Sequence, residues 1–193
     1  WIAAMRPKTL WASVAPVMLG TVFAFGEALF HWPSALACLL MALFAQIGSN
    51  FTNDYCDFIK GADTEKRIGP VRAMQGGLLT SSAMKRGIVL VFFLSFLSGM
   101  FLMSRGGWPM AALTVASILS AILYTAGPYP LGYHGWGDFF VLLFFGPVAV
   151  GGTYYVQALT VSTLSLAGGL TTGLLCTAIL VVNNLRDVEE DAL

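Results

Sequence analysis

Two short stretches of this chain hold almost all of its carboxylates. The 193 residues include ten Asp and Glu, and eight of these lie within residues 54–65 and 187–191. Side-chain amides stand just before each stretch, at Asn50, Asn53, Asn183 and Asn184. Carboxylates inside an otherwise apolar chain are costly and mark functional sites. This concentration of oxygen donors therefore indicates that the chain binds cations for chemistry.

The spacing within each stretch suits one face of a helix. If the preceding apolar segment continues as a helix, Asn50, Asp54 and Asp57 form one polar stripe about 10 Å long. The second stretch repeats this pattern at positions i, i+4 and i+8, through Asn183, Asp187 and Asp191. Two such helix ends that face each other would surround one cavity with carboxylates from both stretches.

Converging carboxylates need a compensating positive charge, because their repulsion in a poorly hydrated site costs several kcal/mol. Mg²⁺ supplies that charge and prefers oxygen, and it usually binds one or two carboxylates together with phosphate oxygens and water. A diphosphate that Mg²⁺ ions bridge to both carboxylate pairs is therefore the interpretation that fits. Metal ions in this position make diphosphate a leaving group by neutralising the charge that it develops.

The segment after the first stretch supplies cations and an amide that suit a diphosphate. The candidates are Lys60, Lys66, Arg67, Arg72 and Gln75. Arg favours bidentate contact with phosphate oxygens, whereas Lys makes a point-charge contact. The alternative is a plain cytoplasmic loop that is rich in positive charge. We favour diphosphate binding for the cations interleaved with carboxylates, and the plain loop for Lys85 and Arg86.

The elements that must position these residues are membrane-spanning helices. The chain is 57% hydrophobic and only 10% charged, whereas a soluble domain carries about 25% charged residues. Uncharged stretches of about 20 residues, the length that crosses a bilayer, predict an all-α, polytopic transmembrane bundle. We expect six spans, at residues 10–30, 34–54, 85–104, 108–125, 138–158 and 164–185. The formal net charge is zero, which gives no reason to expect a nucleic-acid partner; membrane lipid is the expected surrounding.

The distribution of Lys and Arg predicts the orientation of these spans. Nine basic residues fall on the side of the N-terminus, and only Arg105 falls on the other. Positive charge collects on the cytoplasmic side of membrane proteins, so we expect both acidic stretches to face the cytoplasm. Within one membrane domain, 1–193, we expect a cytoplasmic loop at 54–84 with the first motif and a second motif at 183–193. The loop at 126–137 should face the same side.

These motifs resemble those of the UbiA-type membrane prenyltransferases. The first signature reads Asn50-x-x-Asn53-Asp54-x-x-Asp57, then Lys60-Gly61-Ala62-Asp63, then Arg67-Ile-Gly-Pro-Val-Arg72-Ala-Met-Gln75. The second reads Asn183-Asn184-Leu-Arg186-Asp187-x-x-x-Asp191. The loop from Tyr124 to Asp138 and the segment Arg6-Pro-Lys8-Thr9-Leu10 are similar as well. The extended first signature, with its Lys-Gly-x-Asp and Gly-Pro-x-Arg parts, resembles the 1,4-dihydroxy-2-naphthoate polyprenyltransferase branch of this family. That branch makes the menaquinone precursor.

The resemblance implies a UbiA-type fold with about nine helices at full length, so six spans suggest a chain truncated after Leu193. It implies Mg²⁺-dependent transfer of a polyprenyl group from polyprenyl diphosphate to dihydroxynaphthoate, with loss of CO₂ and diphosphate, at the inner membrane of a bacterial cell. The implied metal ligands are Asn50, Asn53, Asp54, Asp57, Asp63, Asn183, Asn184, Asp187 and Asp191. The implied diphosphate contacts are Lys60, Arg67, Arg72, Gln75 and Arg186.

The reaction that the resemblance implies passes through an allylic carbocation, which aromatic faces can stabilise. Tyr124 is the first candidate for this role, and Tyr129 is a weaker candidate that is also considered for acceptor binding. The quinol ring then attacks at the carbon that bears the carboxylate, and CO₂ leaves to restore aromaticity. Arg6 or Lys8 is the candidate partner for the acceptor carboxylate.

Two alternatives remain open from the sequence. Another aromatic acceptor, such as 4-hydroxybenzoate, would use the same motifs. A carboxylate-lined transporter is a different class, since intramembrane carboxylates also line ion pathways. Transporter carboxylates tend to lie near the middle of a span, whereas here they end the spans beside a cationic loop, which favours the enzyme.

Overall fold

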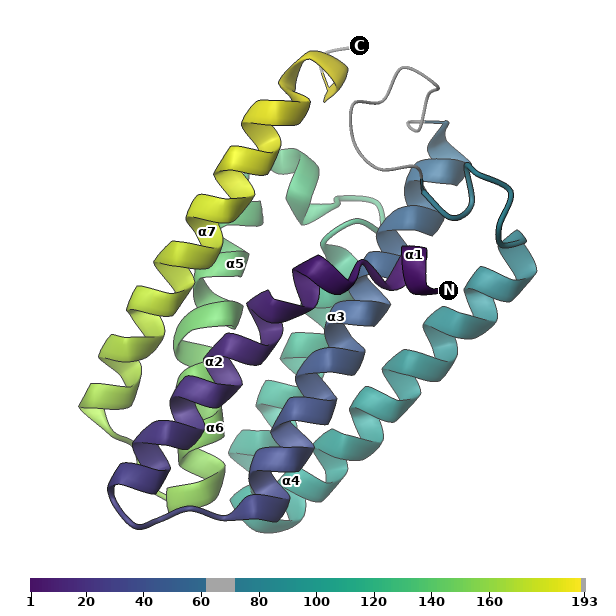
Figure 1. Ribbon diagram of the computed structural model, residues 1–193. Coiled ribbons are helices and arrows are strands. Elements are labelled where there is room, and N and C mark those ends of the chain that lie inside the picture. The colour runs from purple at the N-terminus through teal and green to yellow at the C-terminus, as the bar shows by residue number, and fades with distance from the viewer. Residues whose placement is uncertain (62–71, 192–193) are drawn as a thin grey trace.

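The computed structural model describes residues 1–61 and 72–191, with the side chains of 186–191 outside the description. Helices account for the regular structure of these residues, which confirms the all-α prediction (Figure 1). In chain order they are α1 (Ile2–Met5), α2 (Pro7–Gly26), α3 (Trp32–Lys60), α4 (Ser81–Leu123), the 3₁₀ helix η1 (Leu131–His134), α5 (Gly137–Leu143), the π-helical η2 (Phe144–Val148), α6 (Ala149–Ala158) and α7 (Thr163–Asp191).

Five of the described helical segments are long and apolar enough to cross a membrane. One of them, α4, has 43 residues and covers the expected span 85–104 and all but the last two residues of the expected span 108–125. Gly107, with φ of 69° and ψ of −158°, breaks α4 in the middle, and Pro109 follows. A left-handed φ is readily available to glycine. The chain therefore turns back on itself within α4, and the expected spans at 85–104 and 108–125 are its two arms.

A second interruption divides the crossing that α5, η2 and α6 form together. Gly146 has non-helical dihedrals, with φ of −107° and ψ of −114°, and Pro147 follows it. The backbone of α7 lies directly against this kink, because a Cβ on Gly146 would come within 2.7 Å of the Gly169 carbonyl oxygen. Small residues allow such backbone contact between membrane helices. This contact holds α7 against the kinked crossing.

The expected loop at 54–84 is shorter in the structure. Helix α3 continues past its apolar part to Lys60, and Gly61 ends it with φ of 69°. Helix α4 begins after Thr80, whose side chain accepts a hydrogen bond from the backbone N–H of Ala83. The first carboxylates therefore stand on the last turns of α3, as the helical spacing predicted.

The connections of the bundle are sorted between its two ends (Figure 1). The upper end in the figure holds α1, the C-terminal ends of α3 and α7, and the connection from α4 to α5. A small apolar core supports this end around Phe51, Met74 and Met84. The expected gathering of both motif-bearing helix ends at one end of the bundle is therefore present.

The opposite end is held together by polar contacts to the last turn of α6. Arg105 donates from Nε to the Val156 carbonyl at 2.9 Å and from Nη2 to the Gln157 carbonyl at 3.1 Å. Gln157 in turn donates to Thr21 at 3.3 Å, and Tyr154 donates to Glu27 at 2.5 Å. The single cation expected on this side thus binds the carbonyls that a helix C-terminus leaves unpaired.

Candidate active site

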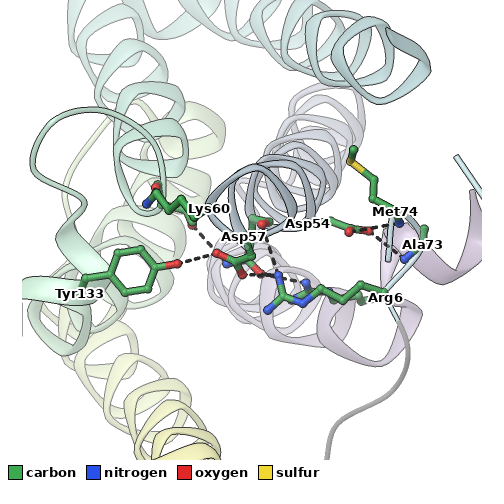
Figure 2. Close-up of polar contacts among 10 residues, drawn as sticks. Arg6, Asp54, Asp57, Lys60, Ala73, Met74 and Tyr133 are labelled. Carbon is green, nitrogen blue, oxygen red and sulfur yellow. Dashed lines mark hydrogen bonds and ion pairs between the residues drawn. The ribbon is translucent and has the colours of Figure 1, made fainter. Parts of the chain in front are cut away.

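Asn50 and Asp54 tie neighbouring backbone to α3. The Asn50 amide donates to the Met5 carbonyl at 2.8 Å and to the Thr9 hydroxyl at 3.0 Å. Asp54 is 1% exposed, and its oxygens accept from the backbone N–H groups of Ala73 at 3.1 Å and Met74 at 3.4 Å. Asp54 therefore fixes the backbone turn that follows Arg72. The Asp54 carboxylate points towards Ala73 and Met74 and away from Asp57 (Figure 2).

Asp57 is the carboxylate that faces a cation. One of its oxygens forms a buried ion pair with Arg72, and the other accepts from the Tyr133 hydroxyl at 2.5 Å. The expected stripe is present on α3, but its two carboxylates have different surroundings: Asp54 meets backbone amides and Asp57 meets charged and phenolic side chains (Figure 2).

Asn53 completes a set of oxygens around one guanidinium nitrogen. Arg72 Nη1 donates to the Asn53 side-chain oxygen at 2.9 Å and to its backbone carbonyl at 3.3 Å, in addition to its contact with Asp57. The Asn53 side-chain oxygen also accepts from Arg6 Nη2 at 2.8 Å. Three oxygens from α3 thus converge on one positively charged nitrogen.

Lys60 lies one turn beyond Asp57. Its ammonium donates to the Thr125 carbonyl at 3.4 Å and stands 4.5 Å from the centre of the Tyr133 ring. The Thr125 hydroxyl accepts from the Asn53 amide at 3.4 Å. The connection after α4 is therefore bound to the end of α3 through Thr125 and Tyr133.

The tyrosines of this connection have three different environments. Tyr124 packs beneath the loop, where a Cβ on Gly132 or Gly137 would come within 3.1 Å of it. Burial raises the pKa of Tyr124, and the nearby Asp138 adds to this shift. Tyr129 stacks on His134 with ring centres 3.6 Å apart and does not reach the cluster on α3 through any contact of the described residues.

Tyr133 is the residue of the cluster that sequence reasoning missed. Tyr133 is 55% exposed, but partial burial raises the pKa of its phenol, and the hydrogen bond to Asp57 raises this pKa further. The phenol therefore keeps its proton and donates a hydrogen bond to the carboxylate. The sequence offered one indication of this role, because Tyr133 lies in a Gly- and Pro-containing loop that is expected on the same side as the acidic stretches. The number of residues between Asp57 and Tyr133 does not predict that they are in contact.

The remaining predicted site residues lie on α2, on α7 and in the turn after Arg72, or outside the description. Lys8 is exposed on the first turn of α2, and Gln75 is half-buried in the turn after Arg72. Asn183 is half-buried and Asn184 is exposed near the end of α7. Asp63, Lys66 and Arg67 lie outside the described residues, and so do the side chains of Arg186, Asp187 and Asp191.

The candidate metal ligands are the carboxylate and amide oxygens of the two motifs. The described residues contain no group of three or more His, Cys, Asp and Glu side chains that could hold a metal ion. The first motif does supply carboxylate and amide oxygens that already surround the positive charge of Arg72. Such oxygens are the ligands that Mg²⁺ prefers, so the donor set of the first motif fits this ion.

Residues 13–193 match the UbiA prenyltransferase family, and the chain belongs to this family. Among curated relatives, the chain is 41% identical to the 1,4-dihydroxy-2-naphthoate octaprenyltransferase of Haemophilus influenzae, with 100% of the chain and 65% of the relative covered. The proteins of the same name from Escherichia coli and Mycobacterium tuberculosis are also 41% identical, covering 99% and 100% of the chain and 64% and 65% of the relatives. The chain thus spans about two thirds of their length, and the match argues against the transporter alternative.

Proposed function

We propose that this protein is a membrane prenyltransferase that transfers a polyprenyl group from polyprenyl diphosphate to 1,4-dihydroxy-2-naphthoate, with loss of CO₂ and diphosphate. Its family membership and the names of its relatives support this reaction. We place it in a bacterial inner membrane with the site towards the cytoplasm, because the described basic residues other than Arg105 belong to the end of the bundle that carries both motifs.

The observation that carries the proposal is the arrangement at the end of α3. Oxygens of Asn53 and Asp57 surround one nitrogen of Arg72, and Arg6 and Lys60 lie beside them. Converging oxygens next to several cations suit a metal ion together with a diphosphate. The apolar helices around this polar end leave the prenyl tail in lipid or between helices.

Within this proposal, Asp57 and Asn53 would hold Mg²⁺ together with Asp187 and Asp191 of the second motif. When bound, Mg²⁺ neutralises the charge that develops on the departing diphosphate. Asp54 acts on the same site through the turn that carries Arg72, since it anchors the two residues that follow. A direct ligand role for Asp54 and for Asp63 stays a prediction.

The cations have a separate task, which is to hold the diphosphate oxygens. Lys60 at the end of α3 and Arg72, whose side chain contacts α3, are proposed for this contact. Arg67 and Arg186 are assigned to it from the motifs. Arg6 shares the Asn53 oxygen with Arg72, which places a guanidinium at the edge of the cluster for the acceptor carboxylate. Positioned charges of this kind act in a water-poor site without reorganising during the reaction.

The aromatic side chains and the acceptor complete the proposed mechanism. Ionisation of the donor leaves an allylic carbocation, and the face of Tyr124 stabilises it. The electron-rich ring of the acceptor attacks through the carbon that bears the carboxylate. The bond to the carboxylate then breaks, CO₂ leaves, and its electron pair restores aromaticity, so no protein base has to remove a proton from carbon.

The reaction can be tested in membranes that contain the protein. With Mg²⁺, labelled prenyl diphosphate and dihydroxynaphthoate, we expect a lipid-soluble prenylated product. Asp57→Ala and Asp187→Ala should each abolish it, whereas Glu27→Gln at the opposite end should leave it intact, because Gln still accepts the hydrogen bond from Tyr154. A rate that survives both aspartate substitutions would refute the metal assignment. With 4-hydroxybenzoate as a competing acceptor, prenylation without CO₂ release would identify that alternative.

A further inference from the structure

Tyr133 reaches from the connection after α4 to the carboxylate at the end of α3. Its hydroxyl donates to Asp57 Oδ1 at 2.5 Å, across a separation of 76 residues in the chain. The other oxygen of Asp57 pairs with Arg72. Both oxygens of this carboxylate therefore have a partner that fixes their direction (Figure 2).

The ring of Tyr133 makes a second contact with α3. The ammonium of Lys60 stands 4.5 Å from the ring centre, a distance at which the ring attracts a cation. Lys60 also donates to the Thr125 carbonyl at 3.4 Å. One side chain thus touches a carboxylate and an ammonium that lie one turn apart on the same helix.

The loop holds Tyr133 in this place through its own backbone. The Gly132 N–H donates to the Tyr124 carbonyl at 2.9 Å, and the Tyr133 N–H donates to the Pro130 carbonyl at 3.2 Å. The Asn53 amide binds Thr125 at 3.4 Å at the start of the same loop. The first two contacts shape the loop around Tyr133, and the third joins the start of the loop to α3.

We propose that Tyr133 is a positioning residue, which acts on the metal through Asp57 and on the diphosphate through Lys60. This inference rests on the proposed function. Groups that hydrogen-bond a metal-ligating carboxylate orient it, and their removal costs about 10- to 100-fold in metal affinity or activity. The hydroxyl of Tyr133 occupies one lone pair of Asp57 Oδ1 and leaves the other for a cation. Its ring holds the ammonium of Lys60 one turn beyond this carboxylate.

The test compares Tyr133→Phe with Tyr55→Phe, a tyrosine of α3 whose ring faces Lys85. Binding of Mn²⁺, a spectroscopic substitute for Mg²⁺, is measured by electron paramagnetic resonance with a non-hydrolysable prenyl thiodiphosphate present. We expect about 10- to 100-fold weaker Mn²⁺ binding for Tyr133→Phe and no change for Tyr55→Phe. The Phe ring retains the contact with Lys60, whereas Tyr133→Leu removes it too and should further weaken binding of the thiodiphosphate at saturating Mn²⁺.

The dependence of the rate on Mg²⁺ separates positioning from a loss of folded protein. For Tyr133→Phe, the Mg²⁺ concentration at half-maximal rate should rise, and the rate at saturating Mg²⁺ should return close to that of the unchanged protein. A rate reduced equally at every Mg²⁺ concentration, or unchanged Mn²⁺ binding, would overturn the proposal for Tyr133. If the unchanged protein itself binds no Mn²⁺ with the thiodiphosphate, the proposed function fails instead.

Discussion

Asp54 and Asp57 lie three residues apart on α3 but have different binding partners. Asp54 is bound by two backbone N–H groups, so it serves the local fold. Asp57 is bound by a guanidinium and a phenol, so it faces charge. The sequence pattern could place both on one helical stripe, because helix periodicity is local. It could not assign their partners, since Ala73 and Tyr133 reach α3 only through the packing of the whole bundle.

The role of Asp54 predicts a loss of stability on substitution. Asp54→Asn keeps one acceptor oxygen but directs an NH₂ group at a buried backbone N–H, so we expect the free energy of unfolding to fall by about 1–3 kcal/mol. Denaturant titration of the purified protein in detergent measures this change. Asp138→Asn is the matched control, because that carboxylate is exposed and its substitution should have little effect. Equal stability of Asp54→Asn and the unchanged protein would contradict the anchoring role.

At the scale of elements, the sequence predicted the spans well and their irregularities poorly. Apolar length identified the membrane crossings, but two of the expected spans proved to be arms of one helix that Gly107 breaks. The π-helical turn at Gly146 was likewise not apparent from hydropathy. Such breaks depend on single glycines and prolines and on the helices that pack against them, which composition does not reveal.

The break in α4 predicts a strong dependence on Gly107. An Ala at φ of 69° and ψ of −158° enters a region that is essentially restricted to glycine, at a cost of about 1–3 kcal/mol. Gly107→Ala should therefore lower the unfolding free energy, as thermal or denaturant unfolding would show. Gly26→Ala is the matched control, because a Cβ there meets nothing within 4 Å and should be tolerated. A stable Gly107→Ala variant would mean that the reversal of α4 does not need this dihedral pair.

The contact of Arg105 with α6 predicts a purely structural effect. Its guanidinium binds two carbonyls at the end of that helix, and hydrogen bonds to a charged group contribute about 1.5–3 kcal/mol each. Arg105→Ala should lower the unfolding free energy, and Arg105→Lys should recover part of it through a single contact. Prenyl transfer by the folded protein should be unaffected, because Arg105 lies at the end opposite the candidate site. A selective loss of activity without a loss of stability would contradict this assignment.

For the whole molecule, the pattern of charges predicted which connections share one end, and the bundle confirms that sorting (Figure 1). This large-scale feature follows from counting spans, since each crossing alternates the side of the chain. The detailed site does not follow from it. The contacts of Asp57 with Arg72 and Tyr133 depend on how the turn after Arg72 and the loop after α4 meet α3, and these are packing properties.

The membrane orientation is a testable prediction at this scale. Lys85→Cys and Val161→Cys place thiols at exposed positions at opposite ends of the bundle. A membrane-impermeant maleimide should label the Lys85→Cys variant in inside-out vesicles and the Val161→Cys variant in intact cells, because basic residues stay on the cytoplasmic side. The unchanged protein, which has free cysteines of its own, gives the background. Labelling with the opposite sidedness would place the candidate site outside the cytoplasm.

The central claim is tested most directly with dihydroxynaphthoate labelled in its carboxylate. Membranes that contain the protein, supplied with Mg²⁺ and polyprenyl diphosphate, should release one labelled CO₂ for each prenylated product. Removing Mg²⁺ by chelation or introducing Asp57→Ala should lower the rate by about 100-fold or more, the scale seen when a preorganised electrostatic contact to the developing charge is lost. A product that retains the labelled carboxylate, or an undiminished rate in the Asp57→Ala variant, would contradict the account.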